Sequence, residues 1–330
     1  MDQDRPWRDM TPETPGGRYL RRFWQPICRS IDLGSTHPIL IPVLGESWVL
    51  FRDGSGFPRL LESNCPHRGT GLQHGRVFDG RLRCRHHGLE FEGDGSCRER
   101  GTPLRSRPTI EKYGLIFGFY GRGDPPPPLV IPELEDRDRC SALPPDVWPC
   151  PFFARLENTL DLRHVATTHA LSGVGGVSVS AATFTSSPAG LEVDLPIGVL
   201  RYRAPNRLVF PVPRDGGWAE VVCFRVPIDS TSCVSFSVGP GVSGGEARLS
   251  NPYLPSKVAQ IGQSIVDGQC RLEDCSNESG LTEIEDYVVL VGADWDIDEP
   301  SEQDRGVLAL RKHWKRCVRE SEQSGSSHSG

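Results

Sequence analysis

The chain has 330 residues, with 37 Lys and Arg against 43 Asp and Glu, so its formal net charge is −6. That length predicts about two domains, and the acidic balance excludes a whole-chain basic field of the kind that binds nucleic acid or anionic membranes. No apolar run approaches the roughly 20 residues of a membrane span, and no signal-peptide pattern is visible. We therefore expect a cytoplasmic protein without a membrane or nucleic-acid partner.

The first half of the chain reads as short strands. Residues 1–35 form an N-terminal segment, and residues 36–124 show short apolar runs broken by turn signals, which predict a compact all-β domain. The turn signals are Asp53-Gly54, Asp79-Gly80 and Asp94-Gly95. Pro125–Pro128 cannot enter a helix or a central strand, so we place the domain boundary there.

The second half, residues 125–320, is expected to be an α+β domain. A helical stretch over residues 153–170 is followed by strand-like runs over 190–239, which predict a curved antiparallel sheet flanked by helices. A last amphipathic helix is predicted over residues 304–321, with its basic residues late in the helix as the dipole favours. The polar residues 321–330 are expected to be a disordered tail.

Two cysteine–histidine pairs carry the strongest chemical signal. Cys65-x-His67 and Cys84-x-x-His87 each supply one thiolate and one imidazole, whereas a C₂H₂ zinc finger keeps its cysteines together and its histidines together. This alternation is typical of a Rieske [2Fe–2S] centre, in which two cysteines hold one iron and two histidines the other. A tetrahedral zinc site is the alternative. Glycines in both loops, where the backbone would approach inorganic sulfide, favour the cluster.

A second group follows in the pattern N-x-x-D-x-x-H-x₄-H, formed by Asn158, Asp161, His164 and His169. On an ideal helix the two histidines would point about 140° apart, so a shared metal requires the helix to distort or end between them. Taken alone, a polar helix end explains these residues equally well. Beside a Rieske motif, they favour a non-haem Fe(II) site with two histidines and one carboxylate, which would accept the cluster's electrons.

The carboxylate of such a site need not be local. We expect it at the start of the last predicted helix, where Asp304 precedes the amphipathic run. The alternative role for Asp304 is that of an acid at a helix start, serving the helix dipole. The competing acidic residues are Asp294, Asp296, Asp298 and Glu302.

With both motifs in this order, the chain resembles the catalytic α subunit of a Rieske non-haem iron oxygenase, in the phthalate-dioxygenase and vanillate-demethylase-like branch. The resemblance implies an N-terminal Rieske β domain followed by a helix-grip, START-like catalytic domain. It also implies the ligand sets: Cys65, His67, Cys84 and His87 for the cluster, and His164, His169 and Asp304 for the mononuclear iron.

The resemblance gives two further residues a role. Asp161 would bridge subunits, its carboxylate accepting one hydrogen bond from His87 of a neighbouring subunit and one from His164 of its own. Asn158 matches a family position near the iron. The chain departs from the family at His86 and Leu89, where the family often has an aromatic residue and Trp; we expect His86 to have a structural or surface role.

The implied reaction uses O₂ and electrons from NAD(P)H, delivered through a separate reductase, with a ferredoxin as a second candidate carrier and a homotrimer as the assembly. It would hydroxylate or demethylate an aromatic or polycyclic small molecule. Cis-dihydroxylation of a ring is the alternative, and a non-catalytic Rieske electron carrier is the remote one. No GxGxxG fingerprint is present, so we expect no dinucleotide domain in this chain.

Two surface features allow a functional and a plain interpretation. Arginines gather around the cluster motif, either as solvated hairpin surface or as a docking face for an acidic electron donor. They are Arg59, Arg68, Arg76, Arg81, Arg83, Arg85, Arg98 and Arg100. The glycine-rich residues 171–180 fit a substrate-pocket loop and a plain surface loop equally well.

Overall fold

The computed structural model describes residues 7, 9–99, 102–135, 140–174, 182–214, 217–240, 248–295, 297 and 299–326. The chain divides into two compact units, neither of which is continuous in sequence. The first, here called the β unit, comprises Leu20–Pro144 and Phe236–Tyr253. The second, here called the α+β unit, comprises the residues up to Tyr19, Pro145–Ser235 and the residues from Leu254 onwards.

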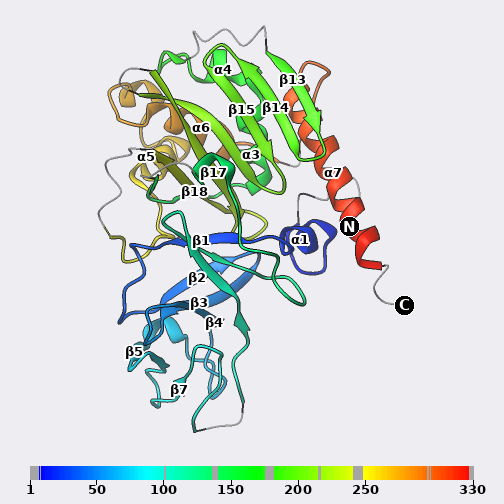
Figure 1. Ribbon diagram of the computed structural model, residues 1–330. Coiled ribbons are helices and arrows are strands. Elements are labelled where there is room, and N and C mark those ends of the chain that lie inside the picture. Colours follow the sequence, from blue (N-terminus) through cyan, green and yellow to red (C-terminus); the bar gives the residue numbers. More distant parts are fainter. Residues whose placement is uncertain are drawn as a thin grey trace. The chain divides into compact units, whose positions relative to one another are not determined.

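The β unit is built from three small antiparallel sheets, as the turn signals predict (Figure 1). One sheet has the order β1 (Gln25–Arg29), β10 (Leu115–Gly118), β9 (Thr109–Lys112). A second has β2 (Ile39–Val43), β3 (Glu46–Arg52), β4 (Pro58–Glu62), β8 (Ser106–Arg107), and a third has β5 (Arg76–Phe78), β6 (Arg81–Arg83), β7 (Glu90–Phe91). Shorter elements of this unit are η1 (Leu72–His74), α2 (Pro132–Glu135) and β11 (Cys140–Ala142), which pairs with the end of β18. Helix α1 (Pro15–Leu20) lies in the α+β unit except for its last residue.

The core of the β unit lies directly behind the two cysteine–histidine loops. Cys65 and Cys84 belong to one buried cluster with aromatic and aliphatic side chains of β3, β6 and β7, including Phe51, Leu82 and Phe91. Leu89, at the position where the family often has Trp, packs into the same cluster. The loops therefore start from fixed, buried points.

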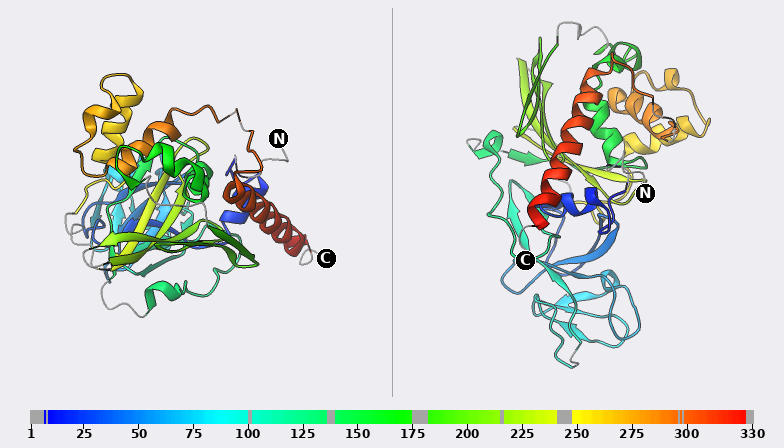
Figure 2. Two further views of the ribbon diagram at one scale, coloured as in Figure 1. Left: turned by 90° about the horizontal axis from the view of Figure 1, so that it is seen from above. Right: turned by 90° about the vertical axis from the view of Figure 1, so that its right-hand side faces the viewer.

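The α+β unit contains most of a long sheet in the order β18 (Cys233–Pro240), β17 (Gly217–Pro227), β16 (Arg207–Arg214), β15 (Gly198–Arg203), β14 (Gly190–Leu195), β13 (Thr183–Ser187), with β12 (Asp146–Trp148) pairing with β18. Only the first three residues of β18, up to Ser235, belong to this unit. The pairs from β13 to β17 are antiparallel. Helices gather on one face of this curved sheet (Figure 2). They are α3 (Phe152–Leu160), α4 (Leu162–Thr168), α5 (Lys257–Val266), η3 (Leu272–Cys275), α6 (Leu281–Val291) and α7 (Arg305–Ser326).

Two helix predictions need correction. The single helix expected over 153–170 is two helices, because the chain leaves helical geometry at Asp161, whose side chain caps α4 by accepting a hydrogen bond from the Arg163 amide. Helix α7 continues to Ser326, so residues 321–326, expected to be disordered, are helical. In the described part of the chain, no helix combines the length and apolar character that a bilayer span requires.

Candidate metal centres

The end of α4 brings the two histidines of the second motif together. The helix ends at Thr168, and the following residue, His169, has φ −95° and ψ 26° while its amide still bonds to Val165. The helix thus ends between the histidines, as a shared site requires. Their rings meet edge to face, with centroids 5.1 Å apart.

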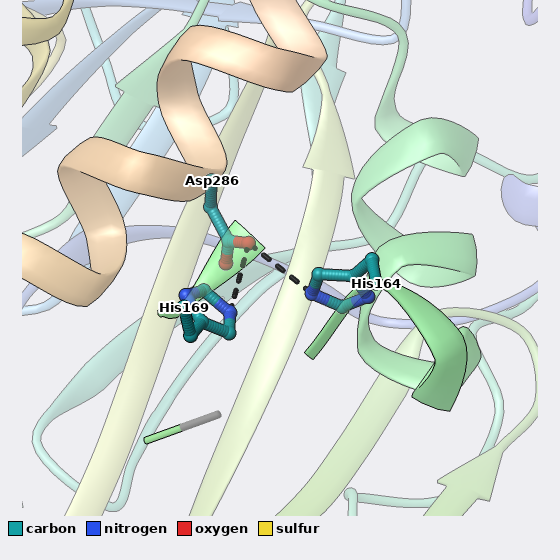
Figure 3. Close-up of side chains that lie close together, drawn as sticks. All are labelled: His164, His169 and Asp286. Carbon is teal, nitrogen blue, oxygen red and sulfur yellow. Dashed lines mark ion pairs between the residues drawn. The ribbon is translucent and has the colours of Figure 1, made fainter. Parts of the chain in front are cut away.

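Asp286, on α6, completes a three-residue cluster with these histidines (Figure 3). Its Oδ1 atom lies 3.4 Å from His164 Nε2 and 3.3 Å from His169 Nε2. One ligand atom of each residue lies within 4.8 Å of the others. The same Oδ1 is buried and has no hydrogen-bond partner in the described part of the chain. A buried, unsatisfied carboxylate oxygen facing two imidazole nitrogens fits the donor set of non-haem Fe(II).

The electrostatics favour an ionised carboxylate at this point. Burial raises the pKa of Asp286, but His164 and His169, and then Arg155 and Asn158, outweigh burial and hold the pKa well below its usual range. The Nη1 atom of Arg155 lies 3.9 Å from Oδ2 of Asp286. Asn158, which the resemblance implies to be near the iron, interacts with the carboxylate of Asp286.

A further layer fixes the two imidazoles. Nδ1 of His164 lies against the main-chain oxygen of Asp161, and Nδ1 of His169 lies 3.0 Å from Oε2 of Glu285. Both acceptors need a proton on Nδ1, so they leave each Nε2 as the free nitrogen that faces Asp286. Burial lowers the pKa of His169, but Asp286 beside it leaves that pKa above its ordinary value.

The structure does not bring Asp304 to the histidines. Its carboxylate accepts hydrogen bonds from the Ser301 amide at 2.6 Å and the Ser301 hydroxyl at 2.9 Å, and it pairs with Arg163 at 2.9 Å. Asp286 therefore replaces it as the candidate third ligand. Of the competing acidic residues, Asp294 and Glu302 do not belong to the described cluster either, and Asp296 and Asp298 lie outside the described residues.

Asp161 also differs from its expected contact. Its carboxylate caps α4, accepting from the Arg163 amide at 3.1 Å, while the ring of His164 turns to the main-chain oxygen of Asp161. The expected hydrogen bond between the Asp161 carboxylate and His164 is therefore replaced by one to the backbone. The part of the prediction that concerns a neighbouring subunit remains a prediction.

In the β unit, the two cysteine–histidine loops have matching backbone turns. Gly69 donates to the Cys65 carbonyl at 2.8 Å, and Gly88 donates to the Cys84 carbonyl at 3.0 Å. Both glycines have positive φ, at 71° and 77°. A Cβ would meet no atom within 4 Å at either position, so glycine is required by the backbone conformation of the turn and not by crowding.

The four expected cluster ligands lie around these turns. Cys65 and Cys84 are buried, with thiols within hydrogen-bonding reach of each other, and the rings of His67 and His87 lie 4.6 Å apart between centroids. Burial raises the pKa of the Cys65 thiol, and the main-chain amides of His67 and Arg68 act against this rise by favouring the thiolate. The thiols are thus inside and His87 is exposed.

His86, expected to have a structural or surface role, is exposed and contacts both loops. Its ring stacks on that of His87, with centroids 3.8 Å apart, and its Nδ1 lies 3.0 Å from the Thr70 hydroxyl of the other loop. Of the nearby arginines, four pair with carboxylates of the same unit, which favours the solvated-hairpin interpretation for these four. They are Arg59, Arg81, Arg83 and Arg98. Arg100 lies outside the described residues.

The chain was compared with known protein families, proteins and structures. Residues 23–113 match the Rieske [2Fe–2S] domain family. The phenoxybenzoate dioxygenase subunit alpha of Ectopseudomonas oleovorans is 34% identical over 49% of this chain and 46% of its own length. The oxygenase subunit of tert-butanol monooxygenase / tert-amyl alcohol desaturase from Aquincola tertiaricarbonis is 33% identical over 56% and 42%.

The chain thus spans less than half the length of these two relatives. Among solved structures, Pseudomonas putida CBB5 NdmA with caffeine superposes with a TM-score of 0.68 over 95% of both chains, at 20% identity, which shows the shared fold. The Rieske match, the oxygenase-subunit relatives and this fold agree with the α+β class and with the motifs. Residues 23–113 thus belong to the Rieske [2Fe–2S] domain family, and the chain is similar over about half of its length to the oxygenase subunits named above.

Proposed function

We propose that this chain is the oxygenase component of a Rieske system that hydroxylates or demethylates an aromatic or polycyclic small molecule. The observation that carries the proposal is the presence, in one chain, of a Rieske domain and the buried group His164, His169 and Asp286. An electron carrier would need the first and not the second, which counts against the non-catalytic alternative.

In the proposed system, residues 36–124 deliver electrons. Cys65 and Cys84 hold one cluster iron from the buried side, and His67 and His87 hold the other. Imidazole ligands carry less negative charge than thiolates, which favours uptake of an electron from a donor protein. The donor is a separate reductase, fed by NAD(P)H, or a ferredoxin.

Residues 125–320 bind substrate and O₂. His164, His169 and Asp286 would hold Fe(II), which supplies a redox-active centre with coordination positions left for O₂. The Asp161 carbonyl and the Glu285 carboxylate keep the Nδ1 proton in place, so that both Nε2 atoms remain available. Arg155 balances the charge of Asp286 from the opposite side of the carboxylate.

The chain is proposed to act as a homotrimer, in which Asp161 links the cluster of one subunit to the iron of the next. A cis-dihydroxylating ring dioxygenase is the second candidate function, because the same donor set serves both reactions. The relative from Ectopseudomonas oleovorans is named as a dioxygenase, which favours keeping this candidate.

The test is product analysis with the purified, iron-loaded chain, a surrogate reductase, NADH and ¹⁸O₂. A panel of aryl methyl ethers, N-methyl heterocycles and benzoates should give a product that is hydroxylated or has lost a methyl group. Two ¹⁸O atoms in a cis-diol would select the dioxygenase. Reduction of the cluster by NADH through the surrogate reductase, without product from any compound of the panel, would contradict an oxygenase.

A further inference from the structure

Glu285, the residue next to Asp286 on α6, is a buried carboxylate that the resemblance does not assign. Its side chain has no exposed surface. Oε2 lies 3.0 Å from Nδ1 of His169, and Oε1 accepts hydrogen bonds from the amides of Leu171 and Ser172, each at 3.1 Å. An isolated carboxylate at such depth is costly, so these three contacts are what make the position tenable.

The two carboxylate oxygens of Glu285 have different partners. Oε2 contacts the ring of His169, and Oε1 accepts hydrogen bonds from the main chain that follows the same histidine. The Ser172 hydroxyl closes this turn by donating to the His169 carbonyl at 3.3 Å. The ring orientation and the backbone conformation of Leu171 and Ser172 therefore depend on one side chain.

This arrangement also fixes which nitrogen of His169 is free. An ionised carboxylate only accepts hydrogen bonds, so Nδ1 must carry the proton. The lone pair is then on Nε2, 3.3 Å from Oδ1 of Asp286. Removing the acceptor would release the ring to the other tautomer, in which Nε2 carries the proton and cannot bind a metal.

We propose that Glu285 is the positioning residue of the mononuclear metal site, and that it couples metal loading to the conformation of Leu171 and Ser172. This inference rests on the proposed function of His164, His169 and Asp286. Metal binding at Nε2 strengthens the Nδ1 donor, so the bond to Glu285 tightens and the carboxylate holds the two amides more firmly.

Glu285→Gln tests the positioning role because it keeps the volume and removes one acceptor. The NH₂ group of glutamine must face either the Nδ1 proton or the two amides, so one contact becomes repulsive. The probe is anaerobic titration of the cluster-containing full chain with Fe(II). We expect Fe(II) affinity to fall by about 10- to 100-fold, the usual effect of losing such a partner.

The matched control is Glu283→Gln, an exposed acid on the same helix. It should bind Fe(II) as the wild type does. The visible spectrum of the Rieske cluster should be unchanged in both variants, which shows that the chain is folded. Wild-type affinity in Glu285→Gln, with weakened affinity in Asp286→Ala, would overturn the positioning role alone. Wild-type affinity in Asp286→Ala as well would mean that the proposed metal site is wrong.

The coupling is tested on the wild-type protein, so it does not depend on how a variant folds. Hydrogen exchange of the peptide containing Leu171 and Ser172 is measured with and without Fe(II). We expect exchange at these two amides to slow several-fold on loading, and to be faster in Glu285→Gln than in the wild type under both conditions. Equal exchange in loaded and metal-free wild type would overturn the coupling.

Discussion

Arg163 pairs with Asp304, with 2.9 Å between Nη1 and Oδ1, and this contact joins α4 to the turn that precedes α7. The Asp304 carboxylate therefore has a structural role, in the same unit that contains the two candidate metal histidines. Its loss should affect stability rather than metal binding.

Asp286→Ala and Asp304→Ala should thus have opposite effects. Asp286→Ala removes an oxygen ligand and should abolish binding of the mononuclear iron while the cluster spectrum remains. Asp304→Ala should keep both the mononuclear iron and the cluster. It should lower the free energy of unfolding by about 1 kcal/mol, because it removes hydrogen bonds that are partly exposed. Iron analysis and denaturant unfolding of the two variants measure this. If the mononuclear iron were lost in Asp304→Ala and retained in Asp286→Ala, Asp304 would be the third iron ligand.

The difference between these two acids shows where sequence reasoning ends. The two histidines lie five residues apart, so local spacing identified them and predicted that the helix must distort or end between them. Asp286 lies more than 100 residues later, and only the packing of α6 against α4 brings it near. Asp304 had the expected position at a helix start, which is a local property that says nothing about which helix faces the site.

Helix α6 did leave a signal in the sequence. Leu281, Ile284 and Tyr287 are buried at intervals of three residues, and two adjacent acids, Glu285 and Asp286, follow the second of them. Acids on the buried side of an amphipathic helix are expensive unless they have partners, so the pair could have been singled out. The strands of the β unit were easier to predict because each Asp-Gly turn marks a hairpin locally.

Asp161 serves both as a helix cap and as the proposed bridge between subunits, and two substitutions separate these roles. Asp161→Asn keeps an oxygen for the Arg163 amide, so stability should change little, whereas Asp161→Ala should lower it by about 1 kcal/mol. If the charged carboxylate carries the bridge, both variants should keep their metals but lose most turnover. Single-turnover oxidation of the reduced cluster measures the transfer, and a near-normal rate in Asp161→Asn would argue against the bridge.

The assignment of the cluster ligands predicts a sharp contrast between two cysteines of the β unit. Cys84→Ser should abolish the visible spectrum of the cluster, because serine oxygen replaces a buried thiolate ligand. Cys97→Ser is the control: Cys97 packs against the same core cluster but is only partly buried, and its thiol faces Glu99. It should retain a normal spectrum. A Cys84→Ser protein with an unaltered Rieske spectrum would disprove the assignment.

His313 predicts a pH dependence of stability that is independent of the metal sites. It is buried on α7, and burial together with Arg316 lowers the pKa of His313 to about 4, against 6.5 for an ordinary histidine. Between these values the unfolded chain binds a proton that the folded chain does not. Stability is therefore complete above about pH 6.5 and falls as the pH drops towards 4, by about 2 kcal/mol between pH 7.5 and pH 5.

The measurement is denaturant unfolding at these two pH values in the wild type, in His313→Leu and in His37→Gln, an exposed histidine of the other unit. Leucine removes the titrating group, and Arg316 keeps its bond to the Ser187 carbonyl at 3.1 Å, so the variant should fold. We expect the pH-dependent loss to shrink by about 2 kcal/mol in His313→Leu and to be unchanged in His37→Gln. An equal loss in all three proteins would mean that His313 has the same pKa in the folded and unfolded chains, because only a difference in proton binding between the two states makes stability depend on pH.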